Sequence, residues 1–315
     1  MADTWFDRRT VHARPFDVDE LIAAKARGGH TVSLVIPARN EAATVGDVVA
    51  GVREAFGGTL LDEIVVIDGA SQDDTARLAA EAGATVHALA DIRPDLGERV
   101  GKGEAIWKSQ FVTTGDLLVF MDADLTEWSP HFVSGLLDPL LADPRVDLVK
   151  GFYERPFRDG SAEVRHGGGR VTELVARPLL ALAFPELTQV VQPLAGEWAV
   201  RRSVYETLHV PVGYGVDLAA LIDIASIHGL DAVAQVDLGR RAHSHQSVHA
   251  LGAMALQLAA TVWSRSGRPV DGLAQLRQFE AGPHGFEPVV RDVDLTERPP
   301  ARTVQGGAVQ GGAGG

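Results

Sequence analysis

The chain has 315 residues, 45% of them hydrophobic, which is enough for one large or two modest domains with a sizeable core. The absence of cysteine excludes disulfides, a thiolate nucleophile and a cysteine-ligated zinc, so we expect a cytoplasmic protein. The formal net charge of −13 argues against nucleic acid and anionic membranes as partners, because both need a basic surface. No apolar stretch is long enough to span a bilayer, so we expect no membrane anchor.

The first half of the chain alternates strand and helix patterns. A helix is expected at 18–26, and short β-branched or apolar runs predict strands at 31–36, 63–67, 84–89, 117–121 and 146–150. Apolar spacing of three and four residues predicts helices at 45–56, 73–82, 103–112 and 132–141. This alternation is typical of an α/β fold with a mainly parallel sheet, whose ligands bind at the carboxyl ends of the strands.

The second half is less regular. Its pattern predicts helices at 171–183, 216–228 and 248–265, with a strand at 232–236. The periodicity fades after about residue 267, and the chain ends in a glycine-rich sequence that has too little apolar area to order itself. We therefore expect a disordered tail.

Two carboxylates end the apolar run LVFMDADL. Asp122 and Asp124 are two residues apart, so on an extended segment they point to the same side, roughly 6 to 7 Å apart. Mg²⁺ is often held by one or two carboxylates together with phosphate oxygens, which predicts a metal and a diphosphate here. The alternative is an exposed loop in which the pair binds nothing.

Other strand ends carry suitable chemistry. The first strand leads into PARNE at 37–41, and the second leads into DGASQDDT at 68–75. Their turns supply backbone amides and acceptors for a base and ribose, although Asn40 and Asp73 are also typical helix caps. Lys102 lies in GKGE, where a helix begins, so its ammonium and the free amides suit a diphosphate. The alternative for Lys102 is a solvated surface side chain.

The combination of SLVIPARNEAATV, EIVVIDGASQDDT, GKGEAIW and VFMDADL resembles the nucleotide-sugar-binding half of GT-A glycosyltransferases. Further on, GGGRVTELVARPLL, QPLAGEWAVRR, GYGVDLAALID and DLGRRAH resemble the glucosyl-3-phosphoglycerate synthase family and its mannosyl-3-phosphoglycerate synthase relatives. The resemblance covers roughly residues 21–268. It implies a GT-A (Rossmann-like) fold with an extension at 1–30, a nucleotide-sugar-binding half at 31–150, an acceptor-binding half at 151–268 and a disordered tail at 269–315.

The resemblance also implies an activity. A metal-dependent enzyme would transfer glucose from a nucleotide sugar, UDP-glucose, to the 2-hydroxyl of 3-phospho-D-glycerate with retention, using Mg²⁺ or Mn²⁺, and would form a homodimer. The departing diphosphate would be stabilised by the metal and Lys102.

The resemblance assigns roles to particular residues. The nucleotide sugar would be bound by Pro37, Ala38, Arg39, Glu41, Asp68, Gly69, Lys102, Asp122 and Ala123. The metal would be held by Asp122, Asp124 and His243, the acceptor by Gly169, Arg170, Thr172, Tyr214 and His245, and catalysis would involve Asp217 and Arg241. The chain departs from the family pattern at Asp217, His245 and Gly69, where relatives carry Glu, Asn and Ser.

Other functions remain open at this stage. They are a mannosyl-3-phosphoglycerate synthase that uses GDP-mannose, a polyprenyl-phosphate glycosyltransferase, a sugar nucleotidyltransferase, and a nucleotide-sugar-binding protein without turnover. The nucleotidyltransferase usually has a glycine-rich loop after its first strand, where this chain has PARNE.

Overall fold

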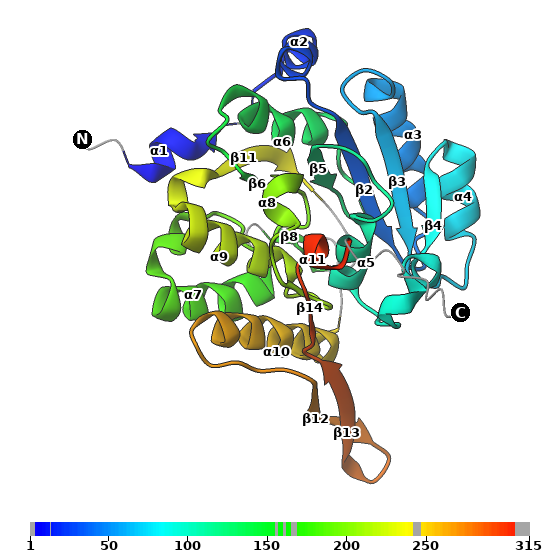
Figure 1. The fold of residues 1–315 in the computed structure, drawn as a ribbon. Coiled ribbons are helices and arrows are strands. Elements are labelled where there is room, and N and C mark those ends of the chain that lie inside the picture. The colour runs from blue at the N-terminus through cyan, green and yellow to red at the C-terminus, as the bar shows by residue number, and fades with distance from the viewer. Residues whose placement is uncertain are drawn as a thin grey trace, which may run out of the picture.

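The computed structural model describes residues 4–12, 14–154, 157–159, 162–164, 169–241 and 247–305. An eight-stranded sheet runs through the molecule in the order β1-β11-β6-β9-β5-β2-β3-β4 (Figure 1). Its strands are β1 (Thr10–Val11), β2 (Val32–Ala38), β3 (Glu63–Asp68), β4 (Thr85–Ala88), β5 (Leu117–Phe120), β6 (Leu148–Glu154), β9 (Trp198–Arg201) and β11 (Val233–Arg240). The sheet is mainly parallel, because only β9 pairs antiparallel with its neighbours β5 and β6. The predicted α/β class is confirmed.

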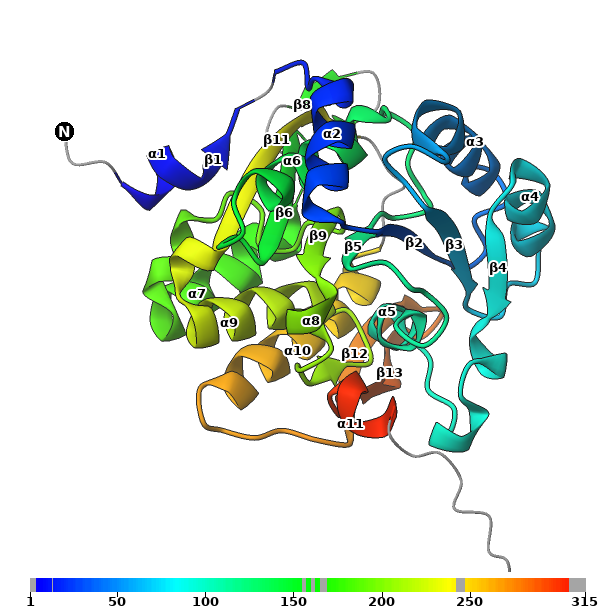
Figure 2. The same ribbon diagram turned by 45° about the horizontal axis from the view of Figure 1, so that its top comes forward.

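Helices cover both faces of the sheet (Figure 2). One core contains side chains of α2 (Val18–Gly28), α3 (Val45–Phe56), α4 (Thr75–Ala82) and α6 (His131–Ala142). The opposite core contains side chains of α5 (Lys102–Ser109), α7 (Arg177–Ala183), α9 (Val216–His228) and α10 (Val248–Arg265). Along β5 the buried side chains alternate between the two cores, as the two-residue period of a strand requires.

The remaining elements are short or lie outside this sandwich. They are α1 (Trp5–Arg9), β7 (Phe157–Asp159), β8 (Ala162–Val164), a π-helix (Thr172–Ala176), α8 (Arg202–Tyr205), β10 (Val210–Pro211), β12 (Leu273–Gly282), β13 (Gly285–Asp294), β14 (Glu297–Arg298) and α11 (Ala301–Gln305), with 3₁₀ turns at Leu89–Asp91, Pro94–Leu96, Pro185–Gln189 and Leu230–Ala232. The predicted single helix at 171–183 is therefore a π-helix followed by α7. No helix among the described residues is both long and apolar enough to cross a bilayer.

The prediction of a disordered tail from residue 269 is wrong for residues 269–305. Strands β12 and β13 form a long antiparallel hairpin that projects from the body, as Figure 1 shows. The chain then returns to the body, where β14 pairs with β10. Ion pairs and hydrogen bonds to distant residues hold this return segment, and composition does not reveal them. Residues 306–315 lie outside the described residues.

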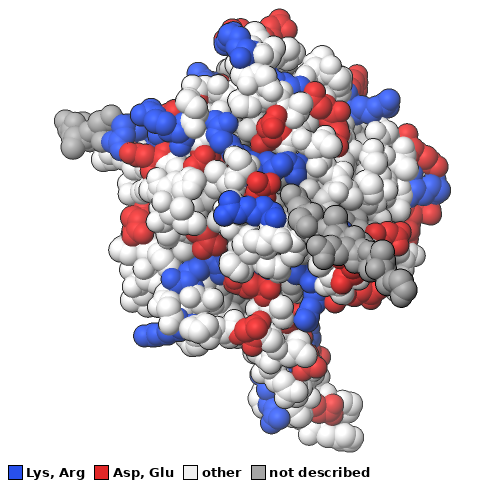
Figure 3. All heavy atoms as spheres, viewed as in Figure 1, with Lys and Arg blue, Asp and Glu red and all other residues white. Residues whose placement is uncertain are grey.

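The sheet crosses the predicted boundary at residue 150, because β9 and β11 of the second half pair with β5 and β6 of the first. The functional division of the chain into halves therefore stays a prediction. On the face drawn in Figure 3, acidic and basic side chains are interspersed over the surface of the body.

Candidate active site

The carboxyl ends of β2 and β3 lie side by side. Ala38 pairs with Asp68 at the end of both strands, and the Gly69 amide donates to the Ala38 carbonyl over 2.8 Å. The two following turns are tied together, since Asn40 Oδ1 accepts from the Gln72 amide over 2.8 Å. Asn40 therefore links the turns and does not cap a helix. The predicted nucleotide-binding segments 37–41 and 68–69 meet at one edge of the sheet.

Asp73 lies one residue before Asp74, the N-cap of α4, and its carboxylate still binds the first amide of that helix. One carboxylate oxygen accepts from the amide of Thr75, the first residue of α4, over 3.1 Å. The other accepts from the Ala42 amide over 3.2 Å, so Asp73 also ties the first turn to the second.

Asp122 and Asp124 follow β5 at the same edge, and both are partly exposed. Lys102, the first residue of α5, places its Nζ 2.8 Å from Asp122 Oδ1. Arg241 donates from one guanidinium nitrogen to Asp122 over 2.6 Å and lies 3.3 Å from Asp124. The predicted Asp122, Asp124, Lys102 and Arg241 are thus brought together from α5, the segment after β5 and the end of β11. We call these four residues, together with Glu197 and Asp217, the charged cluster.

Asp217, in the first turn of α9, joins the cluster through Lys102. Its Oδ2 accepts from Lys102 Nζ over 3.2 Å, and its Oδ1 accepts from the indole Nε1 of Trp198 over 2.7 Å. Asp217 and Trp198 are both buried. The shorter acid at this position is therefore held in a fixed direction, with one oxygen turned toward the lysine.

Glu197 and Trp198 are site residues that the sequence reasoning missed. Glu197 is completely buried, lies 3.2 Å from Arg241 Nε, and accepts from the Tyr153 hydroxyl over 2.6 Å. Because β9 runs antiparallel to β5, its amino end lies beside the carboxyl end of β5, where Asp122 follows. An acid directly before a short apolar run, in GEWAV, is the sequence signal that marks this position.

A buried lysine, Lys150, lies close to Trp198, which contacts the cluster through Asp217. Lys150 donates to the Ala195 carbonyl over 2.7 Å, and its Nζ lies 5.6 Å from the ring centre of Trp198. Burial lowers the pKa of Lys150 to about 8, because the charged form loses its hydration.

Several acidic side chains lie close together at this carboxyl edge of the sheet, and they shift one another's pKa. Burial, followed by the charge of Asp122, raises the pKa of Asp124 to about 6. Burial, followed by the charges of Asp124 and Asp122, raises the pKa of Glu41 to about 7. Burial disfavours the charged form of Lys102 and by itself would lower its pKa. The negative charges of Asp122 and Asp217 have the larger effect, so the pKa of this lysine is raised. Negative charge at this edge therefore exceeds the positive charge of the side chains nearby.

This donor set fits a divalent cation. Hard cations prefer carboxylate oxygens, and Mg²⁺ commonly takes one or two carboxylates with phosphate and water oxygens completing its shell. Asp122 and Asp124 supply such a pair beside other acids. No group of three His, Asp or Glu side chains arranged for a metal occurs among the described residues. The third predicted ligand, His243, lies outside them, as does His245.

The predicted acceptor residues come from two other segments. Gly169 has a φ of 75°, which glycine adopts without strain, and Thr172 is buried at the start of the π-helix. Tyr214 is exposed, and its amide donates to Gln257 over 3.0 Å. Tyr214 lies three residues before Asp217, which connects this loop to the charged cluster. The acceptor roles of these residues and of Arg170 stay predictions, as do the other residue roles.

Comparison with known proteins gives consistent matches. The family model described as glycosyl transferase family 2 matches residues 33–208. The glucosyl-3-phosphoglycerate synthase of Mycolicibacterium smegmatis is 45% identical over 305 residues, which cover 97% of this chain and 99% of the relative. The chain belongs to the glucosyl-3-phosphoglycerate synthase family. The Mycobacterium tuberculosis member is 43% identical over 301 residues, covering 94% of this chain and 92% of the relative.

Crystal structures of the M. tuberculosis glucosyl-3-phosphoglycerate synthase share the fold. Its complex with Mn²⁺ and UDP-glucose has a TM-score of 0.84 at 43% identity, over 94% of this chain and 98% of that chain. Its complex with Mg²⁺ and UDP has a TM-score of 0.85 at 43% identity, over 94% of this chain and 99% of that chain. The predicted GT-A glycosyltransferase fold is confirmed.

Proposed function

We propose that this chain transfers glucose from UDP-glucose to the 2-hydroxyl of 3-phosphoglycerate, giving glucosyl-3-phosphoglycerate and UDP. The observation that carries the proposal is the charged cluster, in which a lysine and an arginine flank an acidic pair at the carboxyl edge of a GT-A sheet. The M. tuberculosis member of the family was crystallised with the matching donor, acceptor and product: UDP-glucose with phosphoglyceric acid, and UDP with glucosyl-3-phosphoglycerate.

In this proposal Asp122 and Asp124 hold Mg²⁺ or Mn²⁺, with His243 as the expected third ligand. The bound cation supplies Lewis-acid stabilisation of the negative charge that develops on the leaving diphosphate. Lys102 stabilises the same charge from the start of α5, at a point already fixed by Asp122 and Asp217. Segments 37–41 and 68–69 bind the uracil and ribose.

Arg241 and Asp217 act on the acceptor side. The guanidinium of Arg241 is held between Glu197 and the acidic pair and orients the anionic acceptor. Arg170 and the amides that follow Gly169 bind the acceptor phosphate, because a glycine turn that opens a helix presents free amides. These groups contribute by positioning the hydroxyl close to the anomeric carbon.

The bond between the anomeric carbon and the diphosphate oxygen breaks, and a bond from that carbon to the acceptor oxygen forms. We propose retention of configuration through attack on the same face, with the acceptor proton passing to the departing diphosphate. No covalent enzyme intermediate is required by this route.

The experiment is a reaction of the purified chain with 3-phosphoglycerate, Mg²⁺ and, separately, UDP-glucose, GDP-glucose and GDP-mannose. We expect glucosyl-3-phosphoglycerate by mass spectrometry, formed fastest with UDP-glucose, and an α-anomeric product by NMR. A mannosylated product from GDP-mannose alone would assign the mannosyl alternative instead. No product from any donor would contradict the proposal.

We further propose that the chain works in the cytoplasm, since phosphorylated substrates of this kind do not cross membranes unaided. The expected homodimer also stays a proposal. Light scattering of the purified chain gives its mass directly, and a monomeric mass would contradict it.

A further inference from the structure

Strand β14 consists of two residues, Glu297 and Arg298, and it lies between two helices of the site. It pairs antiparallel with β10, where Val210 faces Arg298 and Pro211 faces Glu297. Adjacent side chains of a strand point in opposite directions. The structure uses both directions for ion pairs, a buried one at Arg298 and a partly buried one at Glu297.

Arg298 points toward α5. It forms a two-pronged pair with Glu104, with Nε and one terminal nitrogen each 2.7 Å from a carboxylate oxygen. It also donates to the carbonyls of Leu96 and Gly97, over 2.7 and 2.9 Å, in the loop before α5. Glu104 is completely buried and lies two residues after Lys102. Arg298 thus fixes both the start of α5 and the loop that leads into it.

A second contact reinforces the first. The guanidinium of Arg298 lies 5.0 Å from the ring centre of Trp107, and the indole of Trp107 donates to the Pro299 carbonyl over 2.8 Å. These two contacts therefore also join α5, through Trp107, to β14 and to the residue that follows it. Lysine in place of Arg298 lacks the planar fork that makes these contacts together.

Glu297 points the other way, toward α9 and α10. It accepts from Arg265 over 2.6 Å, and Arg265 makes a two-pronged pair with Asp223, with both distances 2.9 Å. Asp223 lies on α9, six residues after Asp217. The two neighbouring residues of β14 therefore connect the helix that carries Lys102 with the helix that carries Asp217, and these two side chains meet at 3.2 Å.

The loop between β10 and α9 is held on the side of α5. The Gly103 amide donates to Gly213 over 3.2 Å and the Glu104 amide to Val212 over 2.9 Å. A side chain at position 103 would bring its Cβ 1.8 Å from the Pro211 carbonyl, so backbone packs directly on backbone here.

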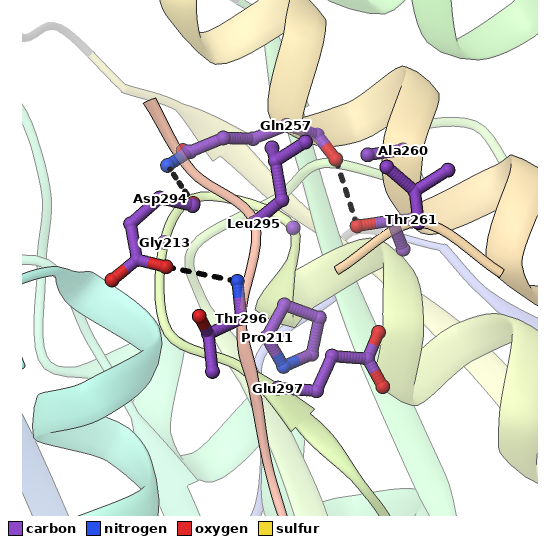
Figure 4. A pocket seen from close by; sticks show the side chains of 11 residues that line it. Pro211, Gly213, Gln257, Ala260, Thr261, Asp294, Leu295, Thr296 and Glu297 are labelled. Atoms are coloured by element: carbon purple, nitrogen blue, oxygen red, sulfur yellow. Dashed lines mark hydrogen bonds between the residues drawn. The ribbon is translucent and has the colours of Figure 1, made fainter. Parts of the chain in front are cut away.

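The other side of the same loop is less filled. A small pocket lies between the loop, α10 and the residues around β14, and it is lined by polar side chains that include Gln257, Thr261 and Glu297 (Figure 4). Gln257 spans its rim by donating to the Asp294 carbonyl over 3.1 Å. The hydrogen bond from the Tyr214 amide to Gln257 holds the loop on this side, while close packing holds it on the α5 side, and β14 is part of that packing.

We propose that Glu297 and Arg298 are positioning residues, which hold Lys102 opposite Asp217 and thereby set the affinity of the site for a nucleoside diphosphate. The inference rests on the proposed function in one respect, because it takes the diphosphate to bind at Lys102. Neither residue reaches the charged cluster directly. Their effect passes through α5 and α9.

The test measures UDP binding to the full chain by calorimetry in the presence of Mg²⁺. We expect Arg298→Lys to weaken UDP binding about tenfold, because small displacements of a positioned charge are costly. Glu104→Gln, which keeps the shape of the side chain, and Glu297→Gln should weaken it in the same direction. These milder variants give the answer if Arg298→Lys does not fold.

Arg201→Lys is the matched control. Arg201 is also a largely buried arginine that donates to carbonyls, those of Leu140, Asp143 and Val146, but it lies at the opposite end of β9 from Trp198. It should lose stability to a similar degree and bind UDP within about twofold of the wild type, at a temperature where circular dichroism shows both proteins folded.

A double-mutant cycle separates positioning from general loosening. In a Lys102→Met background, Arg298→Lys should weaken UDP binding no further, because the group it positions is gone. A tenfold loss that persists in this background, or unchanged UDP binding by all the β14 variants, would overturn the inference. Failure of the wild-type chain to bind UDP would instead contradict the proposed function and the inference with it.

Discussion

The indole nitrogen of Trp198 lies 2.7 Å from one carboxylate oxygen of Asp217 and determines which way that carboxylate faces. The other oxygen is thereby turned toward Lys102. An indole N–H only donates hydrogen bonds, so whatever replaces Asp217 must present an acceptor to it.

The variant Asp217→Asn tests this relationship between Trp198, Asp217 and Lys102. Its amide oxygen would take the Trp198 hydrogen bond, which leaves the NH₂ group facing the ammonium of Lys102, donor against donor. We expect kcat/KM to fall by roughly a hundredfold, since the repelled ammonium of Lys102 leaves the position at which it stabilises the departing diphosphate. Steady-state product formation measures it.

The control for this variant is Asp19→Asn, at an exposed first-turn position of α2. It makes the same chemical change near a helix start and should leave kinetics unchanged. Equal kinetics for Asp217→Asn and the wild type would contradict the proposed role.

Arg241→Gln tests the buried part of the charged cluster. Removing the guanidinium leaves the fully buried Glu197 without its cation, which should lower the free energy of unfolding by about 3 to 5 kcal/mol. Urea unfolding followed by circular dichroism measures this. Adding Glu197→Gln should restore part of the loss, because the uncompensated charge disappears. A single variant as stable as the wild type would show that the pair is not buried as described.

Asp124→Asn tests the metal site. With one of two carboxylates neutralised, Mn²⁺ binding in the presence of UDP should weaken by roughly tenfold or more, as followed by electron paramagnetic resonance. Asp138→Asn, at a surface aspartate paired with Arg14, is the comparison and should bind Mn²⁺ as the wild type does. Unaltered Mn²⁺ binding by Asp124→Asn would remove this residue from the metal site.

Asp143, which is far from the site, should make the stability of the fold depend on pH. Hydrogen bonds from the Arg145 side chain, with further help from Arg9, lower the pKa of Asp143 below its usual value. A lowered carboxylate pKa adds stability above the unfolded value of about 3.9, and this stability is lost as the pH falls through the folded value.

Asp143→Asn should therefore cost up to about 1 kcal/mol at pH 7, since surface pairs contribute little. The difference from the wild type should shrink as the pH falls below about 4, in unfolding curves recorded from pH 7 to pH 3. A difference that does not change over this range would contradict the linkage.

The first half of the fold was predictable because its physics is local. A few residues of sequence are enough to predict β2 and β3 from their β-branched runs, and α3 from its apolar stripe. The carboxyl-edge rule for parallel sheets then places Asp68 and Asp122 at the same edge without any knowledge of distant contacts.

The parts that the sequence did not reveal depend on distant partners. Strand β9 has only four residues and ends in an arginine, so no period can be read from it. Strand β14 has two residues, and it is held by a pair between Arg298 and Glu104, 194 positions apart. Contacts of this kind leave no periodic pattern in the sequence, which is why residues 297–305 read as unstructured. The hairpin of β12 and β13 pairs locally, but its side chains are mostly exposed, so it lacks the apolar run by which a buried strand is recognised.

The position of β9 also has a consequence for synthesis on the ribosome. A nascent chain that ends after Glu154 already contains β2, β3, β5 and β6, but β5 and β6 do not pair with each other, since β9 lies between them. The central hydrogen bonds of the sheet are completed only after residue 201 has emerged from the exit tunnel. Until then the emerging chain exposes open strand edges, which makes this interval the one in which chaperones would be most needed.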